Sequence, residues 1–183
     1  IGSELAQIFR VDDGTRSLPL MDDLGLLPAL FGKESSSQDL AAGIERVQIV
    51  SLQLKLLAKD GLSMPSEFTV DGFSWLAIIR LAAFLSGSGL LTRHRDLLRT
   101  MRFSRRVESI LKNLVSLGPD DGQKLLHLET SDRGYALWVN QLGPAPPLSL
   151  LYLASQVELP DPFRQRARVA MAAYHTHAHL SLI

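Results

Sequence analysis

The sequence predicts an all-α fold, an irregular helical bundle, and three observations favour it. Leucine accounts for 35 of the 183 residues, against three tyrosines and seven phenylalanines. Leucine loses little side-chain entropy in a helix, whereas β-branched and aromatic residues are enriched in strands. Apolar residues recur at three- and four-residue steps in most segments, which is the spacing of a helical face. The strand-like patterns at 68–70 and 126–129 are too short to build a sheet.

Length and composition predict a single helical domain over residues 1–183, with a less regular N-terminal segment, 1–36. Pro19, Gly25 and Pro28 interrupt the helical turns expected at 5–9 and 24–30 in that segment. Hydrophobic residues make up 46% of the chain, which excludes a disordered protein. The absence of cysteine excludes a disulfide scaffold, a thiolate zinc site and a cysteine nucleophile.

The first long helix is predicted over residues 40–59. Ser36 and Asp39 have the spacing of a capping box directly before its apolar pattern. Lys59 near its end complements the helix dipole, and Gly61 follows the last turn.

A second helix is predicted over residues 73–85, with Asp71 as its N-cap and the Gly/Ser cluster 86–89 as its end. This segment is strongly apolar but only thirteen residues long, and Arg80 lies in its middle. A membrane-spanning helix needs about 20 apolar residues, and a central arginine is costly in lipid. We therefore expect a buried core helix and no membrane span.

The rest of the chain divides at turn signals into further short helices. Ser104 is expected to cap one of them, which Gly118 and Pro119 close, and Asp161 with Pro162 begins the last. The other predicted helical segments are 90–101, 124–128, 135–142, 148–157 and 164–179.

Three segments carry a resemblance to a known family. Residues 110–115 (Ile-Leu-Lys-Asn-Leu-Val), 135–142 (Tyr-Ala-Leu-Trp-Val-Asn-Gln-Leu) and 25–30 (Gly-Leu-Leu-Pro-Ala-Leu) resemble core segments of armadillo repeats. The resemblance implies a short armadillo/HEAT-like α-solenoid, whose stacked helices offer a groove to partners. The predicted helix starts near 39, 72, 104 and 147 follow no fixed period, so a solenoid and an irregular bundle both stay open.

Basic residues are concentrated in one part of this neutral chain, which has 19 Lys and Arg and 19 Asp and Glu. Residues 93–112 hold only Asp96 and Glu108 as acids, so the band has a formal charge of +5. It could bind phosphates or an acidic partner, or be a solvated helix face, but it lacks the aromatic residues that stack on bases. This basic band consists of Arg93, Arg95, Arg99, Arg102, Arg105, Arg106 and Lys112. Arg164, Arg166 and Arg168 form a second cluster.

Three histidines near the C-terminus are the most conspicuous group of metal-ligand residues. His175, His177 and His179 could bind a transition metal if they converged. On a helix only His175 and His179 share a face, and no carboxylate nearby supplies a third ligand. We therefore interpret them as an exposed helix end and predict neither a metal nor another cofactor.

The sequence contains none of the glycine-rich phosphate loops, serine-hydrolase elbows or HExxH zinc motifs that mark common enzyme sites. We therefore expect a non-catalytic helical protein–protein interaction module, a scaffold or a subunit of a larger assembly, with acidic protein partners as one option. The alternative is an RNA- or DNA-binding domain that uses the basic band. Residues 1–5 lack a signal-peptide pattern, so we expect an intracellular protein.

Overall fold

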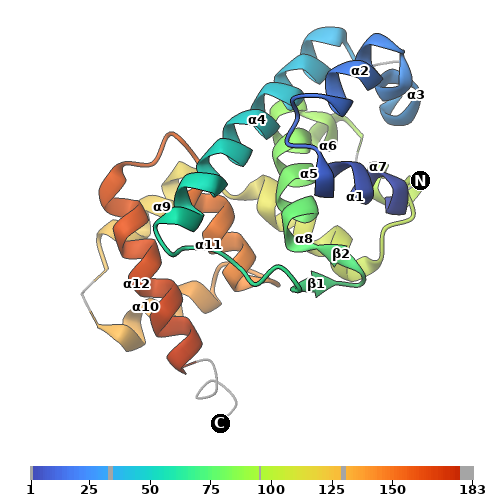
Figure 1. Ribbon diagram of the computed structural model, residues 1–183. Helices are drawn as coiled ribbons and strands as arrows, with labels where there is room; N and C mark the ends of the chain where they lie inside the picture. The colour runs from blue at the N-terminus through green and yellow to red at the C-terminus, as the bar shows by residue number, and fades with distance from the viewer. Residues whose placement is uncertain (1, 33–34, 95, 129–130, 178–183) are drawn as a thin grey trace. The chain divides into compact units, whose positions relative to one another are not determined.

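The computed structural model describes residues 2–32, 35–94, 96–128 and 131–177, and it confirms the all-α prediction (Figure 1). In these residues twelve α-helices are accompanied by one antiparallel hairpin of two-residue strands. The helices are α1 (Gly2–Val11), α2 (Ser17–Asp23), α3 (Leu26–Phe31), α4 (Ser37–Lys59), α5 (Trp75–Ser88), α6 (Leu90–Arg93), α7 (Leu97–Thr100), α8 (Arg105–Ser116), α9 (Pro119–Leu126), α10 (Asp132–Asn140), α11 (Pro146–Ala154) and α12 (Asp161–His177). The strands are β1 (Thr69–Val70) and β2 (Phe73–Ser74).

The helices group into two compact units. The N-terminal unit comprises Ile1–Leu52 and Pro65–Val115, and the C-terminal unit comprises Gln53–Met64 and Ser116–Ile183. Helix α4 begins in the first unit and ends in the second. The expectation that residues 1–183 form a single domain stays a prediction.

Helix α5 is the centre of the N-terminal unit. All residues from Ala77 to Leu85 are buried, so this helix is covered on every side, as its uniformly apolar sequence requires. Helix α1 and strand β2 pack against it (Figure 1). The Phe84 ring lies 5.7 Å from the Phe9 ring and 5.0 Å from the Phe31 ring, which ties α1 and α3 to the same core.

Helices α4 and α5 approach each other closely at two glycines. A Cβ atom on Gly87 would lie 2.7 Å from the Ala42 carbonyl oxygen and 2.7 Å from the Arg46 Cβ. A Cβ atom on Gly43 would lie 2.9 Å from the backbone and ring of Phe84. Gly87 therefore lies inside α5 as a packing residue, and the helix ends two residues later at Gly89, which is left-handed with φ 64°.

The buried Arg80 joins α5 to the C-terminal end of α1. Its side chain is only 6% exposed, and its guanidinium donates to the carbonyls of Phe9 and Arg10, both at 3.1 Å, and to Ser51 Oγ at 3.0 Å. The last carbonyls of a helix have no partner within the helix and carry its partial negative charge. Arg80 thus donates hydrogen bonds to the terminal carbonyls of α1, although Arg80 and Arg10 are 70 residues apart in the sequence.

Two local expectations are wrong in this unit. The segment 90–101 is not one helix, because the chain leaves the helical conformation at His94, where φ is −122° and ψ is 81°. It forms the single turns α6 and α7 instead. The N-cap of α5 is Ser74, whose Oγ accepts from the Ala77 amide at 3.2 Å. Asp71 lies in the hairpin turn with φ 50° and accepts a hydrogen bond from Ser104 Oγ.

Other capping predictions are confirmed. The Asp39 amide donates to Ser36 Oγ at 3.1 Å, and the Ser36 amide donates back to the Asp39 carboxylate at 3.2 Å. Ser104 Oγ accepts from the Val107 amide at 3.2 Å and so caps α8. These motifs form as predicted because all their atoms lie within one helical turn.

The C-terminal unit is built on the pairing of α10 with α12, against which α9 and α11 also pack. Helix α12 buries Phe163, Ala167, Ala170, Met171 and Ala173 along one face. Every residue of α11 from Leu148 to Ala154 is buried. In the part of the chain that the structure describes, we find no helix with the length and apolarity that crossing a membrane requires.

Replacing Arg80 with methionine should destabilise the protein by about 2–4 kcal/mol. Methionine keeps much of the apolar length but leaves the buried Phe9 carbonyl and the partly buried Arg10 carbonyl without the Arg80 donor. Chemical denaturation would measure the change. The matched control is Arg133→Met, in which an exposed arginine is lost and the change should stay within about 0.5 kcal/mol. Equal effects of the two substitutions would contradict the role given to Arg80.

Replacing Gly87 with alanine should also destabilise the protein, by about 1–3 kcal/mol. Alanine gains about 1 kcal/mol of helix propensity, but its methyl group would collide with the α4 backbone at Ala42. The melting temperature of Ser86→Ala, one position earlier in the same helix, is the control. A stabilised Gly87→Ala variant would show that α4 and α5 can separate without cost.

Candidate partner-binding site

The basic band belongs to the N-terminal unit and is distributed over α6, α7 and α8. Arg95 lies outside the described residues. The other six members are all exposed at the surface. The net charge that these side chains present also depends on the carboxylates around them.

Four of the six described cations form ion pairs with carboxylates. Two of these carboxylates, Asp96 and Glu108, are the acids counted within the band, but Asp39 and Asp71 come from distant parts of the sequence. The pairs are Arg93 with Asp39 at 2.6 Å, Arg99 with Asp96 at 3.2 Å, Arg106 with Asp71 at 4.0 Å and Lys112 with Glu108 at 2.6 Å. Asp39 and Asp71 therefore offset part of the positive charge that the sequence gives to the band.

Arg93 has a structural role. Besides its ion pair with Asp39, its guanidinium donates to the Ser88 carbonyl at 2.6 Å, at the C-terminal end of α5. The hydrogen bond from Arg93 holds the pKa of Asp39 well below its usual range, and the bond from Ser36 adds to this shift. Arg93 thus connects the ends of α4, α5 and α6, and a partner would have to break these contacts to use it.

Arg102 and Arg105 are the two described members of the band that form no ion pair and no side-chain hydrogen bond within the described residues. Arg102 adopts φ 59°, a left-handed conformation that is uncommon for residues other than glycine. Its amide donates to the Arg99 carbonyl at 2.9 Å, and the chain then turns into α8. This turn presents both guanidinium groups to solvent.

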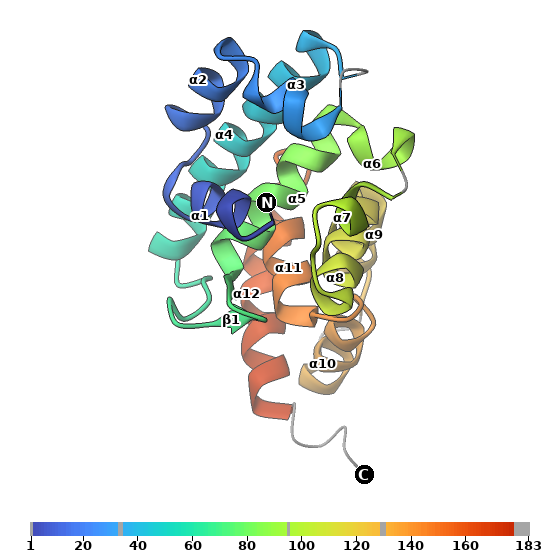
Figure 2. The same cartoon turned by 90° about the vertical axis from the view of Figure 1, so that its right-hand side faces the viewer.

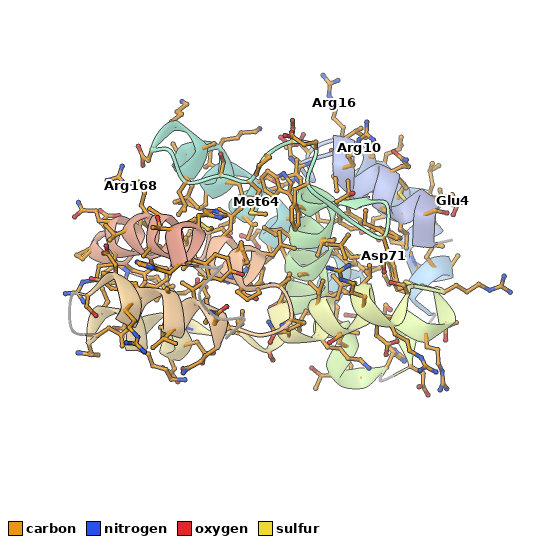
Figure 3. The ribbon with its side chains drawn as sticks, turned by 90° about the horizontal axis from the view of Figure 1, so that it is seen from below. Glu4, Arg10, Arg16, Met64, Asp71 and Arg168 are labelled. Atoms are coloured by element: carbon orange, nitrogen blue, oxygen red, sulfur yellow. The ribbon has the colours of Figure 1, made fainter. Side chains whose placement is uncertain are left out.

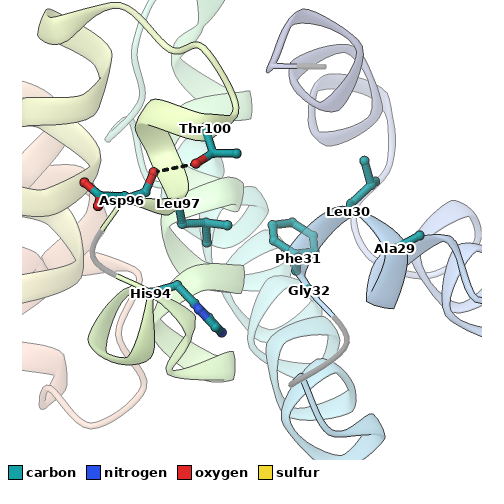
Figure 4. Close-up of a pocket in the computed structure, with 8 residues that line it drawn as sticks. All are labelled: Ala29, Leu30, Phe31, Gly32, His94, Asp96, Leu97 and Thr100. Atoms are coloured by element: carbon teal, nitrogen blue, oxygen red, sulfur yellow. Dashed lines mark hydrogen bonds between the residues drawn. The ribbon is translucent and has the colours of Figure 1, made fainter.

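A pocket of about 420 Å³ lies between α3 and the α6–α7 turn (Figure 4). Leu30 and Phe31 from α3 and Leu97 from α7 supply its apolar part. His94, Asp96 and Thr100 supply the polar part, and Thr100 Oγ1 donates to the Asp96 carbonyl at 3.1 Å. Ala29 and Gly32 complete the lining.

The pocket and the band share one stretch of chain. Arg99 lies between the pocket residues Leu97 and Thr100, and Arg102 follows two residues later. We call the pocket together with Arg99, Arg102 and Arg105 the basic pocket. An apolar hollow beside cationic groups can hold an apolar side chain that has carboxylates next to it.

The sequence singles out the arginines of this candidate site but contains no signal that identifies the whole pocket. One wall comes from α3 and the other from residues more than sixty positions later, and neither has a chemical motif. The apolar run around Leu26 and Leu30 was the available signal, but its partner segment could not be read from the sequence.

The second arginine cluster is used inside the C-terminal unit. Arg166 donates to the carbonyls of Leu125, Leu126 and Leu128 at 2.7–3.3 Å, at the C-terminal end of α9. Arg168, labelled in Figure 3, donates to the Asp60 carbonyl at 2.9 Å, directly after α4. Arg164 pairs with Asp161 at 2.8 Å. Arg166 and Arg168 therefore bind carbonyls at helix ends, and Arg164 forms an ion pair.

Two of the three histidines lie in the last turn of α12. His175 and His177 are two residues apart and therefore point to different sides of the helix, and His179 lies outside the described residues. No group of three His, Cys, Asp or Glu side chains that could hold a metal ion occurs among the described residues. The expectation of a protein without metal or other cofactor stays a prediction.

Comparison with protein-family models, with curated proteins and with solved structures finds no significant match to this chain.

Proposed function

We propose that this chain is a non-catalytic helical module, a scaffold or a subunit of a larger assembly, that binds an acidic segment of a protein partner in the basic pocket. The observation that carries the proposal is a partly apolar pocket whose last lining residue, Thr100, is followed in the chain by Arg102 and Arg105, which have no carboxylate partner among the described residues. Such a site suits a segment that has a leucine or phenylalanine next to aspartate or glutamate.

The expected free energies of apolar burial and of ion pairing give different roles to the pocket and to the arginines. Complete burial of one leucine or phenylalanine side chain contributes about 1.5–3 kcal/mol. An exposed ion pair contributes about 0.2–1 kcal/mol and is screened by salt. The apolar anchor would therefore supply most of the affinity, and the arginines would select acidic partners and speed their association.

An armadillo/HEAT-like solenoid is part of the same proposal. The segment 107–142, from which the resemblance comes, holds α8, α9 and α10 in the expected order of helix, short turn and helix. A solenoid would bind an extended partner segment along its helices, with the basic pocket as one contact among several.

Nucleic acid is the less favoured ligand for this site. Binding of DNA or RNA gains strength from each phosphate that is neutralised, and the band offers few cations without a carboxylate partner. With about three phosphate contacts, the logarithm of the affinity would fall with the logarithm of the salt concentration at a slope of about −3. We expect no retention of generic RNA or duplex DNA at physiological salt. Tight retention there with a steeper slope would favour the nucleic-acid function.

A synthetic peptide would test the proposed partner chemistry. We expect an amphipathic peptide of about 15 residues with leucines at helical spacing and glutamates between them to bind. The same peptide with lysine in place of glutamate should bind at least tenfold more weakly, because it would face Arg102 and Arg105. Isothermal titration or fluorescence anisotropy would measure both. Equal affinity for the two peptides would contradict the role of the arginines.

Two variants separate the pocket from the charges. Thr100→Trp should fill the pocket mouth and abolish peptide binding, whereas Thr176→Trp is its control. Both threonines are exposed and donate to the carbonyl four residues earlier, at 3.1 and 3.0 Å, but Thr176 lies in α12. The double change Arg102→Glu and Arg105→Glu should weaken binding about tenfold, equivalent to about 1.4 kcal/mol. Arg133→Glu, on the exposed surface of α10, should have no effect.

A further inference from the structure

The α2–α3 segment exposes large apolar side chains close to the basic pocket. Leu20 is 57% exposed, Leu24 is 64% exposed and Leu26 is 46% exposed. All three lie within seven residues, on α2, on the turn after it and at the start of α3. Single exposed leucines are ordinary, whereas three within one short segment make that segment a candidate surface for contact with another molecule.

The same segment is acidic. Asp22 and Asp23 lie between the exposed leucines and form no ion pair or side-chain hydrogen bond within the described part of the chain. Arg16, labelled in Figure 3, precedes α2 at its opposite end. We call Leu20, Asp22, Asp23, Leu24 and Leu26 the acidic knob. It has the chemistry that the basic pocket is proposed to bind, leucines with adjacent carboxylates.

The acidic knob and the basic pocket are neighbours in the N-terminal unit. Helix α2 packs against α3 (Figure 2). Helix α3 in turn forms one wall of the pocket. The knob cannot occupy its own pocket, because Leu26 and the wall residues Leu30 and Phe31 belong to the same short helix. A pair of complementary surfaces side by side on one molecule is the arrangement that a two-fold axis makes self-complementary.

We propose that two copies of this chain form a two-fold symmetric dimer, in which the acidic knob of each copy occupies the basic pocket of the other. In this dimer Leu24 and its neighbours would cover the apolar part of the pocket. Asp22 and Asp23 would face Arg102 and Arg99 of the second copy, and Arg99 would leave its ion pair with Asp96. The proposal rests on the proposed function, since it names the segment that fills the basic pocket.

Complementary charge reversal tests the dimer. One variant carries Asp22→Arg and Asp23→Arg, and the other carries Arg99→Asp and Arg102→Asp. Each variant alone should be monomeric or at least tenfold weaker in dimerisation than the natural sequence, because both of its contacts would oppose like charges. An equimolar mixture of the two should dimerise again, because both contacts of the mixed pair are complementary. Light scattering after size exclusion would measure the masses.

Two further measurements test whether the dimer uses the acidic knob and has two-fold symmetry. Leu24→Ser should weaken the natural dimer at least tenfold, whereas Leu137→Ser, at a leucine that is 53% exposed on α10, should leave it unchanged. Both side chains are exposed, so both variants should keep the far-ultraviolet circular dichroism of the parent protein. A series of higher masses in place of a dimer would overturn the two-fold arrangement.

The dimer fails if the natural protein is a monomer up to about 1 mM, or if mixing the two variants restores nothing. The proposed function is tested separately with the Asp22→Arg, Asp23→Arg variant, whose basic pocket is intact and open. If that variant is monomeric and binds the acidic peptide, the pocket has the proposed chemistry whatever the natural protein does. If the natural protein dimerises but this variant does not bind the peptide, the interface lies elsewhere and both proposals are wrong.

Discussion

The contact on which the N-terminal unit depends is the hydrogen bonding of the buried Arg80 guanidinium to the carbonyl end of α1. Burial lowers the pKa of Arg80, and the nearby carboxylates of Asp13 and Asp12 oppose this shift. An arginine has so high an ordinary pKa that it stays charged, and the charge is best placed against the negative end of a helix dipole. The apolar surroundings of α5 make this contact strong, and they make its loss costly.

Hydrogen bonds from arginine side chains to carbonyls at helix ends recur in other parts of the chain. Arg93 binds the last carbonyl of α5, Arg166 binds those of α9, and Arg168 binds the carbonyl that follows α4. Many short helices have many terminal carbonyls without a partner inside the helix. In such a chain, side chains from other elements have to donate hydrogen bonds to these carbonyls. This accounts for arginines that a sequence reader would assign to a phosphate or a partner. The part of the basic band without such contacts is correspondingly small.

The local part of the structure could be predicted and the long-range part could not. The capping box of Ser36 and Asp39 was predictable because both residues belong to one turn. The ion pair between Arg93 and Asp39 could not be predicted, because the two residues are 54 positions apart in the sequence. The break between α6 and α7 has no glycine or proline to mark it. The candidate pocket depends on such distant pairings, and for that reason only its arginines were visible in the sequence.

The course of α4 through both units has a consequence for dissecting the protein. Each unit is assembled from two separate stretches of chain, and Gln53–Met64 belongs with the residues after Ser116. Cleavage of one peptide bond therefore cannot release either unit intact. A recombinant fragment that starts at Ser116 would lack the Asp60 carbonyl that Arg168 binds and the adjoining side chains of Leu57 and Leu62. Genetic truncation would remove parts of two cores at once. The stretches of the two units alternate along the chain, so circular permutation keeps them apart, and either unit in one continuous piece would need a new linker between its two stretches.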